Sequence, residues 1–140
     1  MTQVVKPQKP TQAAACLIVE DSDFDQLRVM RILAKTSRLA PVVAPTLRTA
    51  RALLQRQDFA LVLLDNDLPD GYGINFAGEI REDPRHKDTP IILVSDWPTP
   101  FVYDKAAGLR ISMVLSKDEF QPKHIEEALQ FARIRAASRR

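Results

Sequence analysis

Short apolar segments alternate with longer amphipathic segments along this chain. The apolar segments are rich in valine, isoleucine and leucine, and they occupy residues 15–19, 42–44, 60–64, 91–94 and 111–115. Segments of this length and composition are typical of strands that are buried on both faces. We therefore expect five buried strands.

The amphipathic segments predict five helices that pack on these strands. The helices are expected at residues 24–35, 46–56, 74–82 and 101–107, and from Pro122 onward. In the first helix, Leu27, Met30 and residues 32–34 fall near one apolar face, which should lie against the sheet. A strand followed by a helix, five times over, predicts an α/β fold with a five-stranded parallel sheet and helices on both faces.

The length and composition fit one globular domain. The chain has 140 residues with 45% hydrophobic and 27% charged content. We place the domain at residues 13–137, after a disordered arm at residues 1–12 that holds two Lys-Pro pairs, and before a basic tail at residues 138–140. The longest apolar runs are far shorter than the roughly 18 residues of a membrane-spanning helix, so no membrane contact is expected.

The formal net charge of +2 comes from the two ends of the chain. Residues 1–10 and 133–140 hold six of the 20 bases and none of the 18 acids, so the rest of the chain is net acidic by four charges. An acidic body is a poor surface for nucleic acid, and we expect no DNA-binding domain. The single cysteine, Cys16, cannot form an internal disulfide and is expected in the core of a cytoplasmic protein.

Polar side chains stand where four of the predicted strands end. These are Glu20 and Asp21 after the first strand, Asp65 after the third, Ser95 after the fourth and Lys117 after the fifth. In a parallel α/β fold these ends meet at one edge of the sheet, where ligands bind. If the first and third strands are neighbours, three carboxylates meet there and require a cation, and their hard oxygens suit Mg²⁺. Lys117 supplies a positive charge and Ser95 a hydroxyl donor, so we expect a phosphoryl site.

These residues and their spacing resemble the receiver domains of two-component response regulators. Residues 61–73 read LVLLDNDLPDGYG, with Pro69 four residues and Gly73 eight residues after Asp65, like the phospho-acceptor signature of that family. The separations are also ordinary for the family: 44 residues from Asp21 to Asp65, 30 from Asp65 to Ser95 and 22 from Ser95 to Lys117. The resemblance covers about residues 13–136.

The resemblance implies a flavodoxin-like (βα)5 receiver fold with strand order 2-1-3-4-5. It implies that Asp65 accepts a phosphoryl group from the phosphohistidine of a sensor histidine kinase or a phosphotransfer protein, and that Lys117 and Ser95 contact the phosphoryl oxygens. The implied ligands of Mg²⁺ are Glu20, Asp21, Asp65 and the backbone carbonyl of Asp67. The only reactions expected of such a phosphoprotein are its own phosphorylation and dephosphorylation, so it is not an enzyme in the ordinary sense.

The sequence departs from the family pattern at four positions. Ser95 replaces the commoner threonine and keeps the hydroxyl. Asp96 stands where a small residue is usual, and Val114 where an aromatic residue often reports phosphorylation. Asp118 replaces the proline that usually follows the lysine, often after a cis bond, so the backbone after Lys117 is expected to run differently. The last three departures leave it open whether the phosphorylation switch works.

Three functional classes remain. The first is a single-domain response regulator, since nothing after residue 136 could form an output domain. Its expected partners are the kinase or phosphotransfer protein and a downstream protein target. A weak homodimer is also expected to be possible. The second is a degenerate receiver that acts as an interaction module without phosphorylation. The third is a Mg²⁺ phosphatase of the haloacid dehalogenase type, prompted by the sequence Asp65-Asn66-Asp67. Serine hydrolase chemistry is not expected, because His86 and His124 lie in polar segments that should be at the surface.

Overall fold

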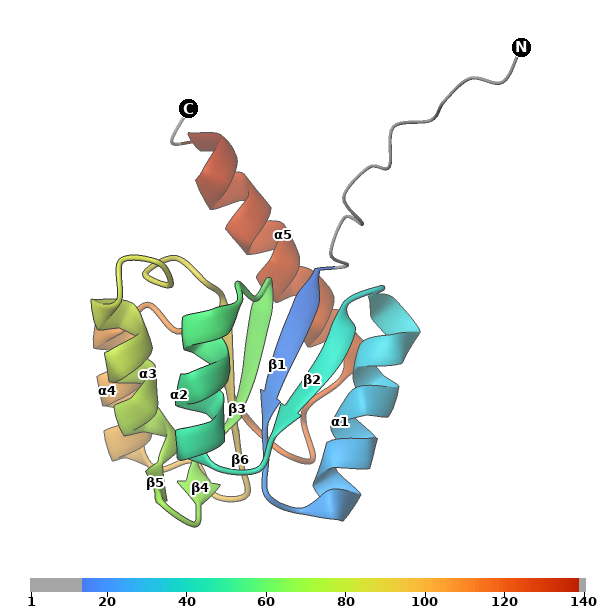
Figure 1. Ribbon diagram of the computed structural model, residues 1–140, viewed down its shortest axis with the longest axis vertical. Coiled ribbons are helices and arrows are strands. Elements are labelled where there is room, and N and C mark those ends of the chain that lie inside the picture. The colour runs from blue at the N-terminus through green and yellow to red at the C-terminus, as the bar shows by residue number, and fades with distance from the viewer. Residues whose placement is uncertain (1–13, 139–140) are drawn as a thin grey trace.

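The computed structural model describes residues 14–138, and the elements follow one another as strand and helix (Figure 1). The predicted arm, residues 1–12, and residues 139–140 of the predicted tail lie outside the described residues. The elements in chain order are β1 (Ala15–Val19), α1 (Asp23–Thr36), β2 (Ala40–Ala44), α2 (Leu47–Arg56), β3 (Leu61–Asp65), β4 (Asp67–Leu68), β5 (Gly71–Tyr72), α3 (Gly73–Glu82), β6 (Ile91–Ser95), α4 (Pro100–Gly108), β7 (Met113–Ser116) and α5 (Pro122–Ser138).

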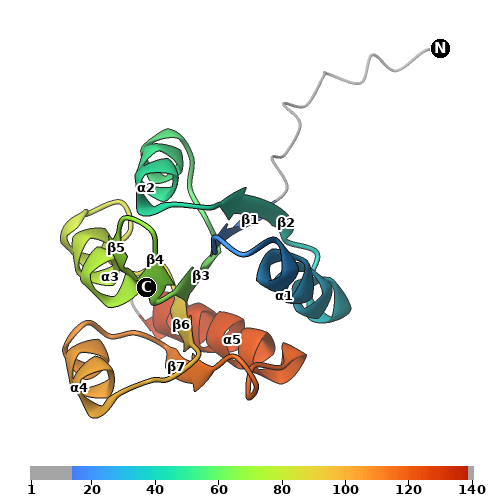
Figure 2. The same ribbon diagram turned by 90° about the horizontal axis from the view of Figure 1, so that it is seen from below.

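Five of the strands form one parallel sheet in the order β2-β1-β3-β6-β7. Because β6 and β7 are the fourth and fifth strands of this sheet, the predicted order 2-1-3-4-5 is confirmed. Helices α1 and α5 cover one face and α2, α3 and α4 the other (Figure 2). The short antiparallel pair β4-β5 was not predicted, since two residues a strand are too few to give a pattern.

Alternate residues of each strand pack into two apolar clusters, one on each face of the sheet. Leu17, Val62 and Leu93 belong to the cluster that α2, α3 and α4 cover. Cys16 and Leu63 belong to the cluster that α1 and α5 cover, which confirms the core position expected for Cys16. Because of this alternation, a residue just after a strand end points to the same face of the sheet as the residue two positions before it.

Strands β2 and β7 begin two residues away from the start of their predicted segments. Strand β2 begins at Ala40, because Pro41 is accepted at the edge of a sheet, where no neighbouring strand needs its missing N–H. Strand β7 begins only at Met113, because Arg110 adopts a φ of 56° and the Ile111 N–H donates back to the Ala106 carbonyl.

Two predictions about burial were wrong. Leu27 is exposed, because the first turns of α1 extend beyond the end of the sheet and have no strand to pack against (Figure 1); Leu33, which belongs to the same predicted apolar face, is buried as expected. His86 is buried although its neighbours are polar, and its Nε2 lies 2.8 Å from the Leu54 carbonyl oxygen. The guanidinium of Arg81 holds the same loop by donating to the carbonyls of His86 and Thr89.

None of the helices in residues 14–138 is long and apolar enough to cross a membrane.

Candidate functional site

Glu20, Asp65 and Lys117 lie at one edge of the sheet and on the same face of it. Glu20 follows β1, Asp65 ends β3 and Lys117 follows β7. Each points to the face of the sheet that α1 and α5 cover. Ile18 and Leu63, which lie two positions before Glu20 and Asp65, pack into the apolar cluster on that face. Since β1 and β3 are hydrogen-bonded neighbours, the two buried carboxylates come together as the sequence predicts.

The three predicted carboxylates form one cluster. Oxygen atoms of Glu20, Asp21 and Asp65 all lie within 4.8 Å of one another, with Glu20 and Asp65 buried and Asp21 exposed. Burial and, second, the nearby charge of Glu20 outweigh the opposing charge of Lys117 and raise the pKa of Asp65 to about 7. Burial also raises the pKa of Glu20. Two buried carboxylates and an exposed third, all hard oxygen donors, fit a magnesium-sized divalent cation.

The Lys117 ammonium is surrounded by carboxylates. Its Nζ lies 2.8 Å from Asp25 Oδ2, 3.4 Å from Glu20 Oε2, 3.8 Å from Asp65 Oδ2 and 3.9 Å from Asp96 Oδ2. Burial by itself lowers the pKa of Lys117, but the hydrogen bond that its ammonium donates to Asp25 and the charges of Asp65 and Glu20 outweigh it, so the pKa is raised overall. Lys117 is therefore a fixed positive charge.

Sequence reasoning missed Asp25. It lies in the first turn of α1, where an acidic residue is expected simply because it complements the helix dipole. Nothing local indicates that its side chain reaches Lys117, which is 92 residues away in the chain. Helix α1 also secures the two strand ends, because Gln26 donates to the Glu20 carbonyl at 2.7 Å and Arg28 donates to the Lys117 carbonyl at 2.8 Å.

Ser95 and Asp96 lie beside this cluster at the end of β6. Ser95 is buried and follows Val94, the register partner of Asp65. Its carbonyl accepts a hydrogen bond of 3.0 Å from the Lys117 N–H. Asp96 exposes 62% of its side chain, so it faces mainly solvent even though one oxygen approaches Lys117. No peptide bond within residues 14–138 is cis, and the segment after Lys117 runs through trans bonds.

The loop after Asp65 is secured by hydrogen bonds from its own polar residues. The Asn66 side chain accepts from the Ile74 N–H at 3.0 Å, and its carbonyl accepts from the Gly73 N–H at 2.8 Å. The Asp67 N–H donates to Asp65 Oδ1 at 3.3 Å, which places Asp67 next to the carboxylate cluster. Asp70 accepts from two N–H groups at the start of α2 and so attaches the loop to the neighbouring helix.

Comparisons with known proteins agree with this arrangement. The family model "Response regulator receiver domain" matches residues 16–130, and the chain belongs to that family. It is 33% identical over 124 residues to the transcriptional regulatory protein BasR of Escherichia coli, a match that covers 89% of this chain and 52% of BasR. This chain thus spans about half the length of that relative.

Solved structures of the same fold resemble the chain closely. The CheY-like receiver domain protein of Methanospirillum hungatei is 19% identical, with a TM-score of 0.78 over 88% of this chain and 98% of that one. The Mn²⁺-bound form of the response regulator Rcp1 is 24% identical, with a TM-score of 0.68 over 85% of this chain and 88% of that one. The receiver family and the flavodoxin-like fold expected from the sequence are confirmed.

Proposed function

We propose that this chain is a response regulator receiver domain that is phosphorylated on Asp65. The phosphoryl group comes from the phosphohistidine of a sensor histidine kinase or a phosphotransfer protein, and the signal passes on by binding a downstream protein or by phosphorelay. The proposal places the receiver at residues 13–137 and the protein in the cytoplasm. It rests on one observation: the buried Asp65 carboxylate lies within 4.8 Å of two further acidic side chains and 3.8 Å from the Lys117 ammonium.

Glu20, Asp21 and Asp65 would hold Mg²⁺, with the Asp67 backbone carbonyl completing the protein's share of ligands. When bound, the ion offsets negative charge on the phosphoryl oxygens. The hard oxygen donors of the cluster support this assignment, and so does the Mn²⁺ bound in the structure of the similar protein Rcp1.

The chemistry requires positioning and charge neutralisation more than proton transfer. A carboxylate oxygen of Asp65 forms a bond to phosphorus while the bond between phosphorus and the donor imidazole breaks, and the product is an acyl phosphate. The Lys117 ammonium contacts one phosphoryl oxygen and gives up part of its contact with Asp25. The Ser95 hydroxyl donates a hydrogen bond to another.

An exposed apolar surface lies next to the site on α1 and suits a docking donor. Phe24 exposes 75% and Leu27 53% of its surface, and both lie within six residues of Asp21. Transfer to Asp65 requires the donor histidine to approach this end of the sheet, so a partner's apolar face can pack here during the reaction.

The decisive experiment is intact mass measurement after incubation with Mg²⁺ and acetyl phosphate. We expect the mass of one added phosphoryl group, removable with hydroxylamine, on the native chain and none on Asp65→Asn. Omitting Mg²⁺ should also prevent the addition. Labelling of Asp65→Asn at a hydroxylamine-labile site would contradict the proposal.

A receiver that acts without phosphorylation is the second candidate, and Val114 favours it. Val114 packs against the apolar cluster that α2, α3 and α4 cover. A valine at this position provides no aromatic side chain whose orientation could report phosphorylation. Absence of phosphoryl uptake from every small donor would support this candidate. The haloacid dehalogenase alternative is not retained, because the chain belongs to the receiver family and Asp65 ends the third strand.

A further inference from the structure

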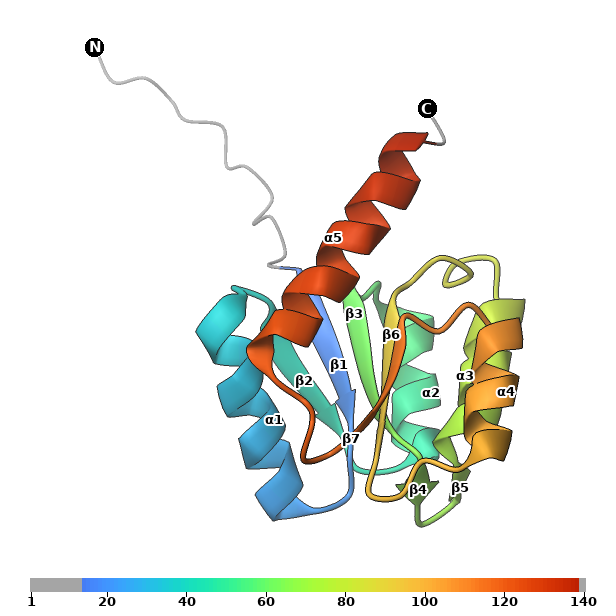
Figure 3. The same ribbon diagram turned by 180° about the vertical axis from the view of Figure 1, so that it is seen from behind.

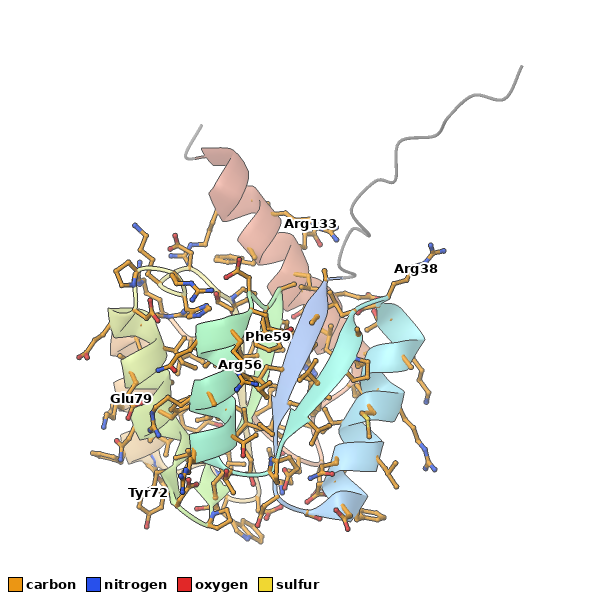
Figure 4. The ribbon with its side chains drawn as sticks, viewed as in Figure 1. Arg38, Arg56, Phe59, Tyr72, Glu79 and Arg133 are labelled. Carbon is orange, nitrogen blue, oxygen red and sulfur yellow. The ribbon has the colours of Figure 1, made fainter. Side chains whose placement is uncertain are left out.

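Three exposed aromatic side chains line a groove beside the candidate site. Tyr72 of β5, Trp97 in the loop before α4 and Phe101 in the first turn of α4 expose 60%, 86% and 67% of their surface. Together with Asp67 they belong to the lining of an open groove of about 250 Å³. Strand β5 and the start of α4 lie at the same end of the molecule (Figure 3), and Figure 4 shows Tyr72 at that end. Exposed apolar groups gathered in one place mark a binding surface.

Acidic side chains accompany these rings. Asp67 lines the groove and is exposed, and Asp96, which directly precedes Trp97, exposes 62% of its side chain. One ring already holds a cation, since the Lys105 Nζ lies 5.8 Å from the centre of the Phe101 ring. Aromatic faces attract cations, and aromatic-lined grooves bind proline-rich segments, which lose little conformational entropy on binding. The groove therefore suits an extended segment that carries both lysine and proline.

The chain itself contains a segment of this kind. Residues 6–10 read KPQKP, which gives two Lys-Pro pairs with the spacing Pro-x-x-Pro. In a polyproline II helix of three residues per turn, Pro7 and Pro10 fall on the same side. Residues 1–13 include no acid, so the charge of this segment is complementary to that of Asp67 and Asp96.

A chain cannot place this segment in its own groove. Figure 1 shows that β1 begins at the end of the sheet opposite to β4 and β5. Pro10 and Ala14 are four residues apart in the sequence, which is at most about 14 Å of extended chain, whereas the five residues of β1 already extend about 17 Å. The segment that fills the groove must therefore come from another copy of the chain.

We propose that residues 6–10 of one copy bind the Tyr72–Trp97–Phe101 groove of a second copy. Pro7 and Pro10 pack against the rings, and the lysines lie beside Asp67 and Asp96. A contact of five residues is far smaller than the roughly 1,200–2,000 Å² of stable interfaces, so the association is weak and increases with concentration. It involves neither a metal nor a phosphoryl group, so it stands or fails separately from phosphorylation of Asp65.

The first test adds a synthetic peptide of residues 1–13 to the full, unphosphorylated chain without metal. Fluorescence anisotropy of the labelled peptide gives the affinity, and the emission of Trp97, the only tryptophan of the chain, reports on the groove. We expect saturable binding with a change in emission, weakened by higher salt. Peptides with Pro7→Ala and Pro10→Ala, or with Lys6→Glu and Lys9→Glu, should bind more weakly. No binding of the native peptide, or equal binding of all three, would overturn the proposal.

The second test changes the groove. Tyr72→Ser and Phe101→Ser should each reduce the affinity for the peptide at least about tenfold. Tyr103→Ser is the matched control, since Tyr103 is an exposed aromatic residue of α4 that is not part of the groove lining. Binding that tolerates both groove substitutions, or an equal loss with Tyr103→Ser, would rule out this groove.

The third test concerns the source of the segment. In sedimentation equilibrium the full chain should self-associate at concentrations above the dissociation constant of the peptide. Tyr72→Ser and an excess of free peptide should each reduce this self-association. A chain that stays monomeric at those concentrations would overturn the assignment of the segment to a second copy.

Discussion

Gly73 packs directly on the backbone of Asp65. A Cβ at position 73 would lie 2.1 Å from the Asp65 carbonyl oxygen, a distance that no real contact allows. This close approach allows the Gly73 N–H to donate to the Asn66 carbonyl and helix α3 to begin immediately beside the candidate site. The need for glycine eight residues after Asp65 is therefore steric.

Gly73→Ala should destabilise the protein by about 1–3 kcal/mol or more, because the added methyl forces the loop away from Asp65. Gly78→Ala is the matched control in the same helix. No atom lies within 4 Å of its added Cβ, so the alanine should stabilise α3 by about 0.5–1 kcal/mol. Urea denaturation of both variants measures the difference, and equal effects would contradict the steric account.

The stability of the metal-free protein should fall as the pH rises from about 4 to about 7. The ordinary pKa of an aspartic acid is about 3.9, whereas burial and the charge of Glu20 raise the pKa of Asp65 to about 7 in the folded protein. In this window the folded state holds a proton that the unfolded state has lost, so the free energy of unfolding decreases with rising pH.

Asp65→Asn should flatten this dependence and raise the stability above pH 7 by on the order of 1–3 kcal/mol. Thermal or urea denaturation with a chelator present, at several pH values, provides the measurement. A pH profile identical to that of the native chain would show that Asp65 is not the group responsible.

Lys117→Ala should reduce phosphorylation by acetyl phosphate about a hundredfold or more, since it removes the ammonium that lies 3.8 Å from Asp65 Oδ2. Lys105→Ala and Lys87→Ala are controls. Lys105 contacts Asn75 of α3 and the Phe101 ring of its own helix, and Lys87 is exposed in the loop before β6. A similar loss in all three variants would indicate a general effect of charge.

Asp25→Asn should speed phosphorylation about two- to tenfold. The substitution weakens the hydrogen bond of 2.8 Å that competes with a phosphoryl oxygen for Lys117, a bond with a net value of about 0.5–1.5 kcal/mol. Asp23→Asn removes the same charge from the same helical turn without a contact to Lys117, so it should leave the rate nearly unchanged. A slower Asp25→Asn variant would mean that Asp25 instead holds Lys117 in its working position.

Asp96→Ala should change the rate of phosphorylation by about twofold or less, because an exposed carboxylate is largely screened by solvent. Asp96→Asn, compared at low and high salt, separates charge from bulk. A gain that disappears at high salt identifies electrostatic repulsion of the donor, and a large gain that persists in salt would show that the side chain blocks access to Asp65.

The parallel sheet and the family could be predicted from the sequence, and so could the residues that the sheet brings together at one edge. Apolar runs mark buried strands because both faces of a parallel strand are covered. The positions just after those runs mark one edge of the sheet because all five strands point the same way. Glu20, Asp65 and Lys117 could be grouped on this basis, and the spacing from Asp65 to Gly73 added a specific family signature.

Other contacts could not be predicted, because they depend on how distant elements pack in the folded protein. Asp25 resembles any acidic residue in a first helical turn until the fold brings Lys117 to within 2.8 Å of it. His86 stands among polar neighbours, and its burial depends on a loop packed against the Leu54 carbonyl. The exposure of Leu27 follows from where α1 passes the end of the sheet. Local patterns specify elements because backbone periodicity is local, whereas these contacts join residues far apart in the chain and depend on how the finished elements pack.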